Sequence, residues 1–132
     1  MNNINPYFKE LDEIHVEIEA LFNGSADEGV LQRIMARFAP QFTLVMTSGI
    51  ALDHAGVREI FSKLHGARPG SQITIRDKEI VAEYPSAAVV KYREYQRDGV
   101  GNANVRRSTA VMDLDAHGKV TWRHLQETFC SE

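Results

Sequence analysis

Near the C-terminus, the stretch VTWRHLQETF gathers side chains that could bind a ligand or transfer a proton. Its residue types predict a β-strand, and successive side chains of a strand point to opposite faces. We predict that the face with Trp122, His124 and Gln126 lines a cavity. The opposite face, with Leu125 and Phe129, is then free to meet a partner. A β-bulge in this strand would exchange the two faces.

A second polar group is expected on the strand at 87–96, AAVVKYREYQ. One face of this strand is apolar at its start and ends on Tyr92, Glu94 and Gln96. A carboxylate in an apolar cavity has a raised pKa, so Glu94 could share a proton with His124 and act beside a carbonyl as general base or acid. Two other interpretations stay open. Glu94 could anchor a ligand, or it could form a structural ion pair with Arg106 of the next strand.

His15 lies beside the apolar Ile14 and Ile18 on the first predicted helix and could reach the same cavity. It is either a hydrogen-bonded wall residue or an acid–base group. No two histidines have metal-ligand spacing, so we predict no metal site. The glycine-containing segment GVGNAN lacks a lysine and a strand–loop–helix context, so no phosphate loop and no cofactor are predicted.

The elements that must position these side chains begin with helices. Asn5 and Pro6 form a helix start, the apolar spacing continues to Leu21, and Gly24 is a stop signal. A second helix is predicted from the cap Asp27 to Pro40, with apolar residues up to Phe38. A third helix is predicted at 53–65, with Asp53 as its N-cap.

Strand patterns dominate the rest of the chain. They predict strands at 42–47, 71–84, 87–96, 104–115 and 120–129. Helices first and long antiparallel strands afterwards predict an α+β domain, with three N-terminal helices on one face of a strongly curved antiparallel sheet. The length of 132 residues fits a single domain, residues 1–132.

The composition argues against two kinds of binding partner. The net charge is −3 and the basic residues do not form a stripe, so we expect no nucleic-acid partner. Apolar runs stop far short of the ~20 residues that cross a bilayer, so we expect no membrane partner. A single cysteine, Cys130, and no charged-then-apolar start favour a cytoplasmic location.

The phrases VVKYREYQ, RRSTAVMDLDAHGKVTW and WRHLQET, in this element order, resemble the nuclear transport factor 2-like (NTF2-like) superfamily. The likeness is greatest to its SnoaL-like and calcium/calmodulin-dependent kinase association-domain branch. It implies a cystatin-like cone, a bent sheet around a long first helix with a cavity at the open end, and homodimers paired sheet to sheet. By likeness to the kinase association domain, the cavity set includes Tyr92, Glu94, Arg106 and Ser108. The superfamily contains ketosteroid isomerases, dehydratases, polyketide cyclases and adaptors, so fold alone does not define the reaction.

Three functional hypotheses follow. The leading one is a homodimeric protein that binds an unidentified small molecule in a partly polar cavity. The alternative is an isomerase-, cyclase- or dehydratase-type enzyme in which Glu94, His124 or His15 moves a proton. The third is an assembly module, which the lack of a fused domain disfavours. The predicted ligand-binding residues are Tyr92, Glu94, Arg106, Ser108, Trp122, His124, Gln126 and His15.

Overall fold

A computed structural model describes residues 4–131, and within that range the chain forms three helices and six strands. The helices are α1 (Pro6–Asn23), α2 (Val30–Met35) and α3 (His54–Leu64). The strands are β1 (Phe38–Val45), β2 (Ala51–Leu52), β3 (Gln72–Tyr84), β4 (Ala87–Arg97), β5 (Ala103–Leu114) and β6 (Val120–Cys130).

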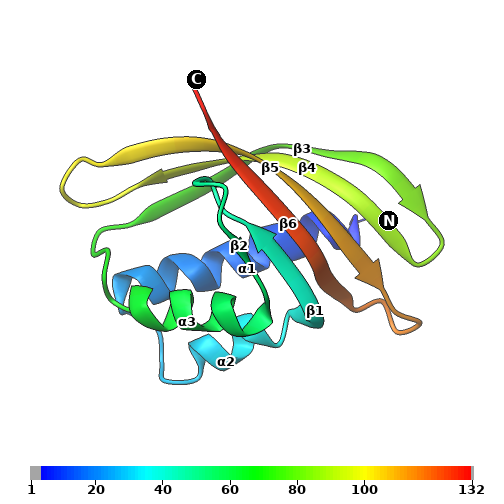
Figure 1. Ribbon diagram of the computed structural model, residues 1–132, viewed down its shortest axis with the longest axis horizontal. Helices are drawn as coiled ribbons and strands as arrows, with labels where there is room; N and C mark the ends of the chain where they lie inside the picture. The colour runs from blue at the N-terminus through cyan, green and yellow to red at the C-terminus, as the bar shows by residue number, and fades with distance from the viewer. Residues whose placement is uncertain (1–3, 132) are drawn as a thin grey trace.

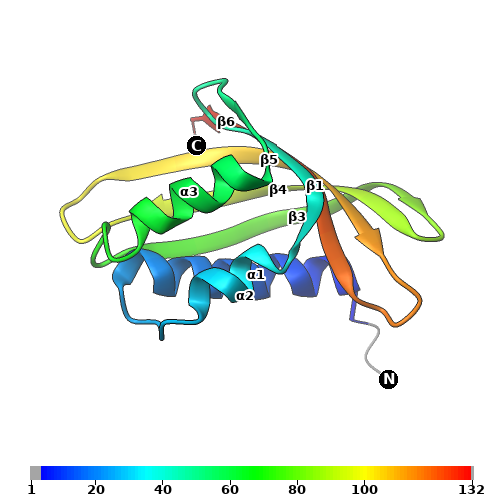
Figure 2. The same ribbon diagram turned by 60° about the horizontal axis from the view of Figure 1, so that its bottom comes forward.

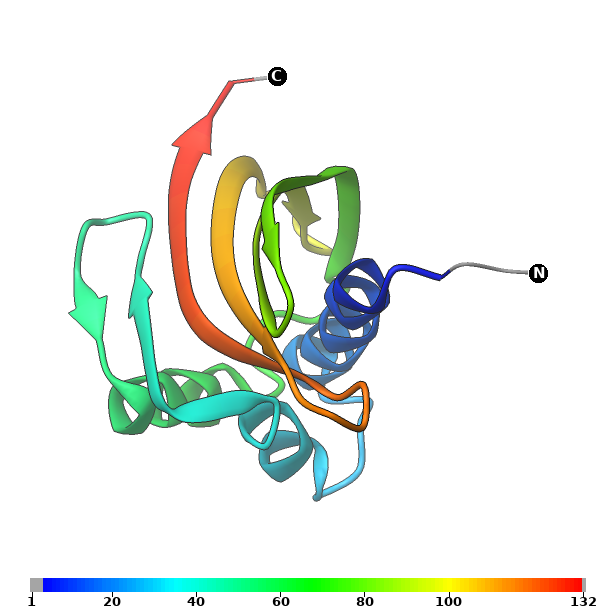
Figure 3. The same ribbon diagram turned by 90° about the vertical axis from the view of Figure 1, so that its right-hand side faces the viewer.

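The strands form one sheet in the order β2-β1-β6-β5-β4-β3. Neighbouring strands are antiparallel except for β1 and β6, which run parallel and are separated in the chain by α3 and four strands. Figures 1 and 2 show the helices of the described chain together on one side of the sheet. Figure 3 shows how strongly the long strands bend. The predicted α+β cone is confirmed, with one parallel pairing in its sheet.

The predicted start and end of α1 are confirmed. The side-chain oxygen of Asn5 accepts hydrogen bonds from the backbone N–H groups of Tyr7 and Phe8, and Pro6 opens the helix. Gly24 ends it at a φ of 69°, a left-handed conformation that glycine adopts without steric cost. Asp53 likewise caps α3 by accepting from the Gly56 N–H. Among the described residues, no helix is both long and apolar enough to cross a membrane.

The second helix is shorter than predicted and the first strand longer. Asp27 accepts from the Gly29 N–H before the helix, which begins at Val30 and ends at Met35. Phe38 and Pro40 belong to β1, not to the helix. Pro40 is tolerated there because the β1–β6 register shifts between Phe38 and Thr43, so its missing N–H removes no ladder hydrogen bond. The two-residue strand β2 was not predicted.

The core lies between α1 and the sheet. Leu11, Ile14 and Leu21 on α1 pack with Trp122 and with the start of β1. α1 runs along β3 at one edge, and α3 packs on β1 near the other. These contacts hold the helices apart over part of the sheet, and the candidate site lies in that space.

Candidate functional site: a cavity between sheet and helices

Residues of β6 change face at a β-bulge. Met112 of β5 pairs with Trp122, but the preceding Val111 pairs with His124, so Arg123 is an extra residue on β6. At the bulge the backbone N–H of Trp122 donates to the carbonyl oxygen of Arg37, where β6 meets the chain leading into β1. Because strand faces alternate with a period of two, one extra residue exchanges the faces beyond it.

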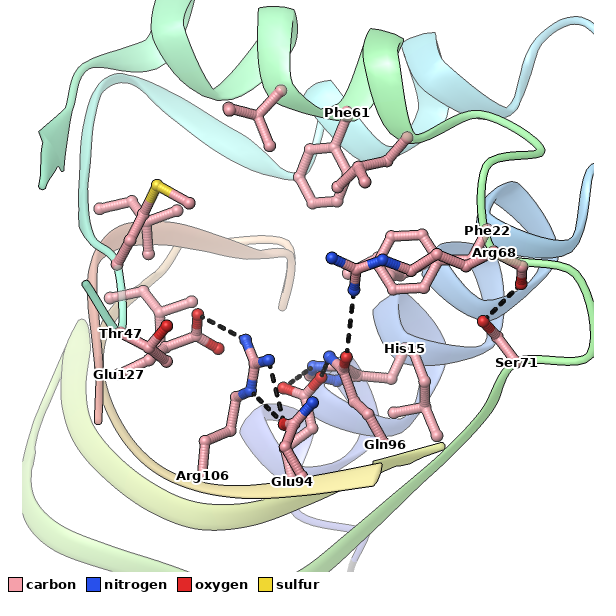
Figure 4. A pocket seen from close by; sticks show the side chains of 18 of the residues that line it. His15, Phe22, Thr47, Phe61, Arg68, Ser71, Glu94, Gln96, Arg106 and Glu127 are labelled. Carbon is pink, nitrogen blue, oxygen red and sulfur yellow. Dashed lines mark hydrogen bonds and ion pairs between the residues drawn. The ribbon is translucent and has the colours of Figure 1, made fainter. Parts of the chain in front are cut away.

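The cavity has a volume of about 400 Å³, within the usual range for sites that hold small organic molecules. Its walls are mainly apolar and come from α1, α3, β1 and the inner face of the sheet. Aromatic rings are prominent among them: Phe22, Phe38, Phe42, Phe61, Trp122 and Phe129. Figure 4 shows Phe61 of α3 opposite a floor that carries His15, Glu94, Arg106 and Glu127.

His15 and Glu94 form a buried pair on this floor. The Nδ1 atom of His15 lies 2.7 Å from the Leu11 carbonyl oxygen, and its Nε2 atom lies 3.1 Å from Oε1 of Glu94. A carbonyl oxygen can only accept, so Nδ1 carries a proton. The Nε2–Oε1 contact then holds one proton, on the imidazole or on the carboxyl, and the pair is neutral overall in both cases.

The charged form of the pair is favoured. Burial acts to raise the pKa of Glu94, but the charge and hydrogen bond of His15, together with the Arg106 charge, lower it to about 2. Burial by itself lowers the pKa of His15, yet the charge and hydrogen bond of Glu94, together with the Leu11 carbonyl and the Glu127 charge, outweigh it and leave that pKa raised. The side-chain amide of Gln96 donates to the other oxygen of Glu94, which also stabilises the carboxylate.

The polar chain continues from Gln96 to the mouth of the cavity. The Gln96 amide oxygen accepts from Arg68 at 3.5 Å, and the Arg68 guanidinium lies 5.1 Å from the centre of the Phe22 ring. Arg68, Gln96, Glu94 and His15 thus form one continuous row from solvent to the floor, visible in Figure 4.

Arg106 is held beside this row by β5 and β6. Its Nε and Nη2 atoms donate to Oδ1 of Asn104 at 3.2 and 3.1 Å, and its Nη1 atom donates to Oε2 of Glu127 at 3.3 Å. The Phe129 ring lies against the guanidinium, 5.4 Å from its central carbon. Burial and the charge of Glu94 raise the pKa of Glu127 to about 7, although Arg106 opposes the shift.

Four of the eight predicted ligand-binding residues lie where the sequence placed them. Glu94, Arg106, Trp122 and His15 line the cavity. The indole N–H of Trp122 is not available to a ligand, however, because it donates to Glu10 at 3.0 Å. The predicted Glu94–Arg106 contact exists as a cross-strand register pair, but the ion pair of Arg106 is with Glu127.

Tyr92 and Ser108 occupy the predicted face but lie beneath the floor. The His15 ring packs edge-on against Tyr92, 5.7 Å between ring centres. Both hydroxyl oxygens are buried without a hydrogen-bond partner among the described residues. Burial raises the pKa of Tyr92 well above its ordinary value, so its hydroxyl stays protonated.

His124 and Gln126 were predicted to face inward, and the structure contradicts that placement. Both lie beyond the bulge, on the outer face of the sheet, where the Thr43 hydroxyl lies 2.6 Å from Nδ1 of His124. The predicted proton sharing between Glu94 and His124 is therefore wrong, and His15 takes that position. Leu125 and Phe129, predicted for a partner surface, line the cavity instead.

Sequence reasoning missed Glu127, Asn104 and Arg68. Glu127 shares a strand face with the apolar Leu125 and Phe129, and that shared face was the available signal for an inward position. Asn104 and Arg68 lie at the end of a strand and in a loop, where alternation carries no information. Among the described residues, no group of three or more His, Cys, Asp or Glu side chains could hold a metal ion.

The geometry defines an α+β cone with an apolar cavity and a polar, partly charged floor. Among solved structures, the chain is similar to an NTF2-like protein of unknown function from Pseudomonas aeruginosa, with 38% identity and a TM-score of 0.93 over 96% of this chain and 100% of the other. The chain belongs to the NTF2-like family. The resemblance seen in the sequence is confirmed.

More distant structures share the fold alone. One is a protein with a cystatin-like fold from Nostoc punctiforme, at 16% identity and a TM-score of 0.71, covering 100% of this chain and 97% of the other. Another is a ketosteroid isomerase-like protein from Erwinia carotovora, at 12% identity and a TM-score of 0.66, covering 98% and 100%. No family model matches the sequence, and no curated protein matches it.

Proposed function

We propose that this protein binds a small organic molecule in the cavity between α3 and the sheet. The observation that carries the proposal is the combination of aromatic walls with a compact polar floor. Apolar walls favour a ligand with a hydrocarbon body, and a few convergent polar groups orient it. Arg106, Glu94 and Glu127 are the groups that would contact the polar end of the ligand.

Trp122 provides a direct test, because the chain's one tryptophan lines the cavity. A neutral fluorophore such as N-phenylnaphthylamine should quench Trp122 emission saturably and raise the melting temperature. Leu44→Phe places a ring in the cavity and should abolish quenching. Val16→Phe adds the same ring at a position that is 68% exposed and should leave quenching unchanged. Equal quenching in both variants would contradict the proposal.

Proton transfer is a second candidate, favoured by the single proton held between His15 and Glu94 at the floor. An acid–base pair beside a bound carbonyl can remove and return a proton on the adjacent carbon. The ketosteroid isomerase-like neighbour supports only the fold of such an enzyme. The test is deuterium incorporation from heavy water into tetralone, a bicyclic ketone. Incorporation that Glu94→Gln does not reduce would exclude this role.

We also propose that two copies pair through the outer sheet face, which helices do not cover in Figure 1. Val89, Val111 and His124 form a half-buried row across neighbouring strands on that face. Light scattering should find a dimer at micromolar concentration. Val111→Glu should shift it to monomer, whereas Val81→Glu, at a position 55% exposed on β3, should not. A wild-type monomer would remove this proposal without affecting the cavity.

A further inference from the structure

The charges that face the cavity do not cancel. Their role as argued here rests on the proposed small-molecule binding. The titratable lining residues are His15, Arg68, Glu94, Arg97, Asp98, Arg106 and Glu127. His15 and Glu94 share one proton and are neutral as a pair. The remaining groups leave one net positive charge when Glu127 is ionised and two when Glu127 is protonated.

The positive charge at the floor belongs to Arg106, and its geometry leaves it able to bind. A guanidinium has five N–H donors. Among the described residues, Asn104 takes two and Glu127 takes one. Two donors therefore remain on a side chain that lines the cavity and is held in place by Asn104 and the Phe129 ring. The planar pair of N–H donors on a guanidinium matches the two oxygens of a carboxylate, so a carboxylate is the polar group that Arg106 would bind best.

We propose that the ligand is an organic acid with an apolar, ring-sized body, bound as its carboxylate at Arg106, and that Glu127 takes up a proton as the acid binds. The body of the acid lies against Phe61 and Phe42, which line the cavity. Arg68 at the mouth attracts the anion as it enters.

The proton uptake follows from the position of Glu127. A ligand carboxylate on Arg106 would lie beside a second carboxylate on the same guanidinium, and like charges at such distances cannot both remain ionised at low cost. Glu127 faces Arg106 on β5, Glu94 and Tyr92 on β4 and His15 on α1. Burial and Glu94 already raise its pKa to about 7, so it is the group that protonates. Protonated Glu127 can then donate a hydrogen bond to the ligand.

The test compares acids with neutral molecules of the same shape. Benzoate, phenylbutanoate and naphthoate are titrated by calorimetry into the full-length protein, each beside its amide. We expect each carboxylate that binds to bind about tenfold or more tightly than its amide. Arg106→Gln should remove this preference. Arg107→Gln is the matched control, because Arg107 is the neighbouring residue on the exposed face of the same strand.

Proton uptake is read from the same titrations in Hepes and in Tris, whose ionisation heats differ. Near pH 7.5 we expect roughly half to three-quarters of a proton bound per carboxylate, because Glu127 is already partly protonated there, and none in Glu127→Gln. Amides that bind as tightly as their acids would overturn this inference and leave small-molecule binding intact. Carboxylate binding without a buffer effect would overturn the role of Glu127. Failure of the acids, the amides and the neutral fluorophore alike would overturn the proposed function itself.

Discussion

Two buried carboxylates, Glu10 of α1 and Glu127 of β6, have different surroundings. Glu10 on α1 has a partner for both oxygens: Arg37 lies 2.6 Å from Oε1, and the Trp122 indole N–H donates to Oε2 at 3.0 Å. Glu127 on β6, by contrast, has one hydrogen bond among the described residues, from Arg106 at 3.3 Å. Burial raises the pKa of both carboxyl groups, but only Glu10 has a hydrogen-bond partner on each oxygen among the described residues.

The contrast separates a structural ion pair from a binding site. Around Glu10, Arg37 has three carboxylates within 4 Å, from Glu10, Glu13 and Glu17, so its charge is balanced within the protein. Around Glu127, Arg106 has one carboxylate within 4 Å among the described residues and two N–H groups without a partner there, which the proposed ligand would use. A buried polar group that lacks some of its hydrogen-bond partners is therefore a better guide to function than one whose partners are all within the protein.

The largest effect on stability is expected at the ion pair between Glu10 and Arg37. Glu10→Ala leaves the Trp122 N–H without its partner and Arg37 without its closest one. It should lower the free energy of unfolding by about 3 kcal/mol. Urea unfolding measures this. Glu13→Ala, at a half-exposed position 3.9 Å from Arg37, is the control and should cost less than about 0.5 kcal/mol. Similar losses in both variants would refute the assignment of Glu10 as the structural anchor.

The second-largest effect on stability is expected at the His15–Glu94 pair on the cavity floor. His15→Leu leaves Glu94 buried without its cation and should cost about 2 kcal/mol near pH 7. The loss should shrink near pH 4, because Glu94 without His15 has a higher pKa and becomes neutral there. The comparison requires urea unfolding at both pH values. His117→Leu, in an exposed turn, should show neither the loss nor its pH dependence.

A stabilising change is expected at Glu127. Its pKa in the folded protein, about 7, lies above the value of 4.5 for an unperturbed carboxyl. Stability from this group is therefore full below about pH 4.5 and is lost as pH rises through about 7. Glu127→Gln mimics the protonated form and should raise the free energy of unfolding by roughly 1–2 kcal/mol near pH 8, with little change near pH 5.

The measurement for Glu127 is the unfolding free energy of wild type and variant across that pH range. Glu83→Gln, on an exposed part of β3, serves as the control and should leave the wild-type pH profile unchanged. A Glu127→Gln variant that is less stable than wild type near pH 8 would show that the ionised carboxylate stabilises the fold.

The smallest effect on stability is expected at Arg106. Arg106→Gln should change the free energy of unfolding by less than about 1 kcal/mol, because it frees Glu127 to protonate. Arg37→Gln should cost more, about 2 kcal/mol, because three carboxylates lose one shared cation. Urea unfolding of the two variants side by side compares the two sites directly, and an equal loss of stability would contradict the distinction between them.

Elements with strong local signals were predictable. The Asn5 cap, Pro6 and Gly24 define α1, and the Asp53 cap defines the start of α3, because each depends on hydrogen bonds or φ angles within a few residues. The inward face of β4 was also predictable, because its alternation is unbroken from Ala88 to Gln96. The end of α2 was not, since Phe38 and Pro40 join β1 through pairing with a strand more than eighty residues later.

The sequence by itself determined the α+β class, the order of the elements and the position of Glu94 and Arg106 on neighbouring strands. It also determined that His15 lies on the core-facing side of α1, because the apolar spacing of that helix is local. Only the tertiary structure decided that Glu127, rather than His124, faces the cavity. The reason is one extra residue, Arg123, where β6 meets the chain entering β1. A strand has a period of two, so a single long-range contact exchanged every face beyond it.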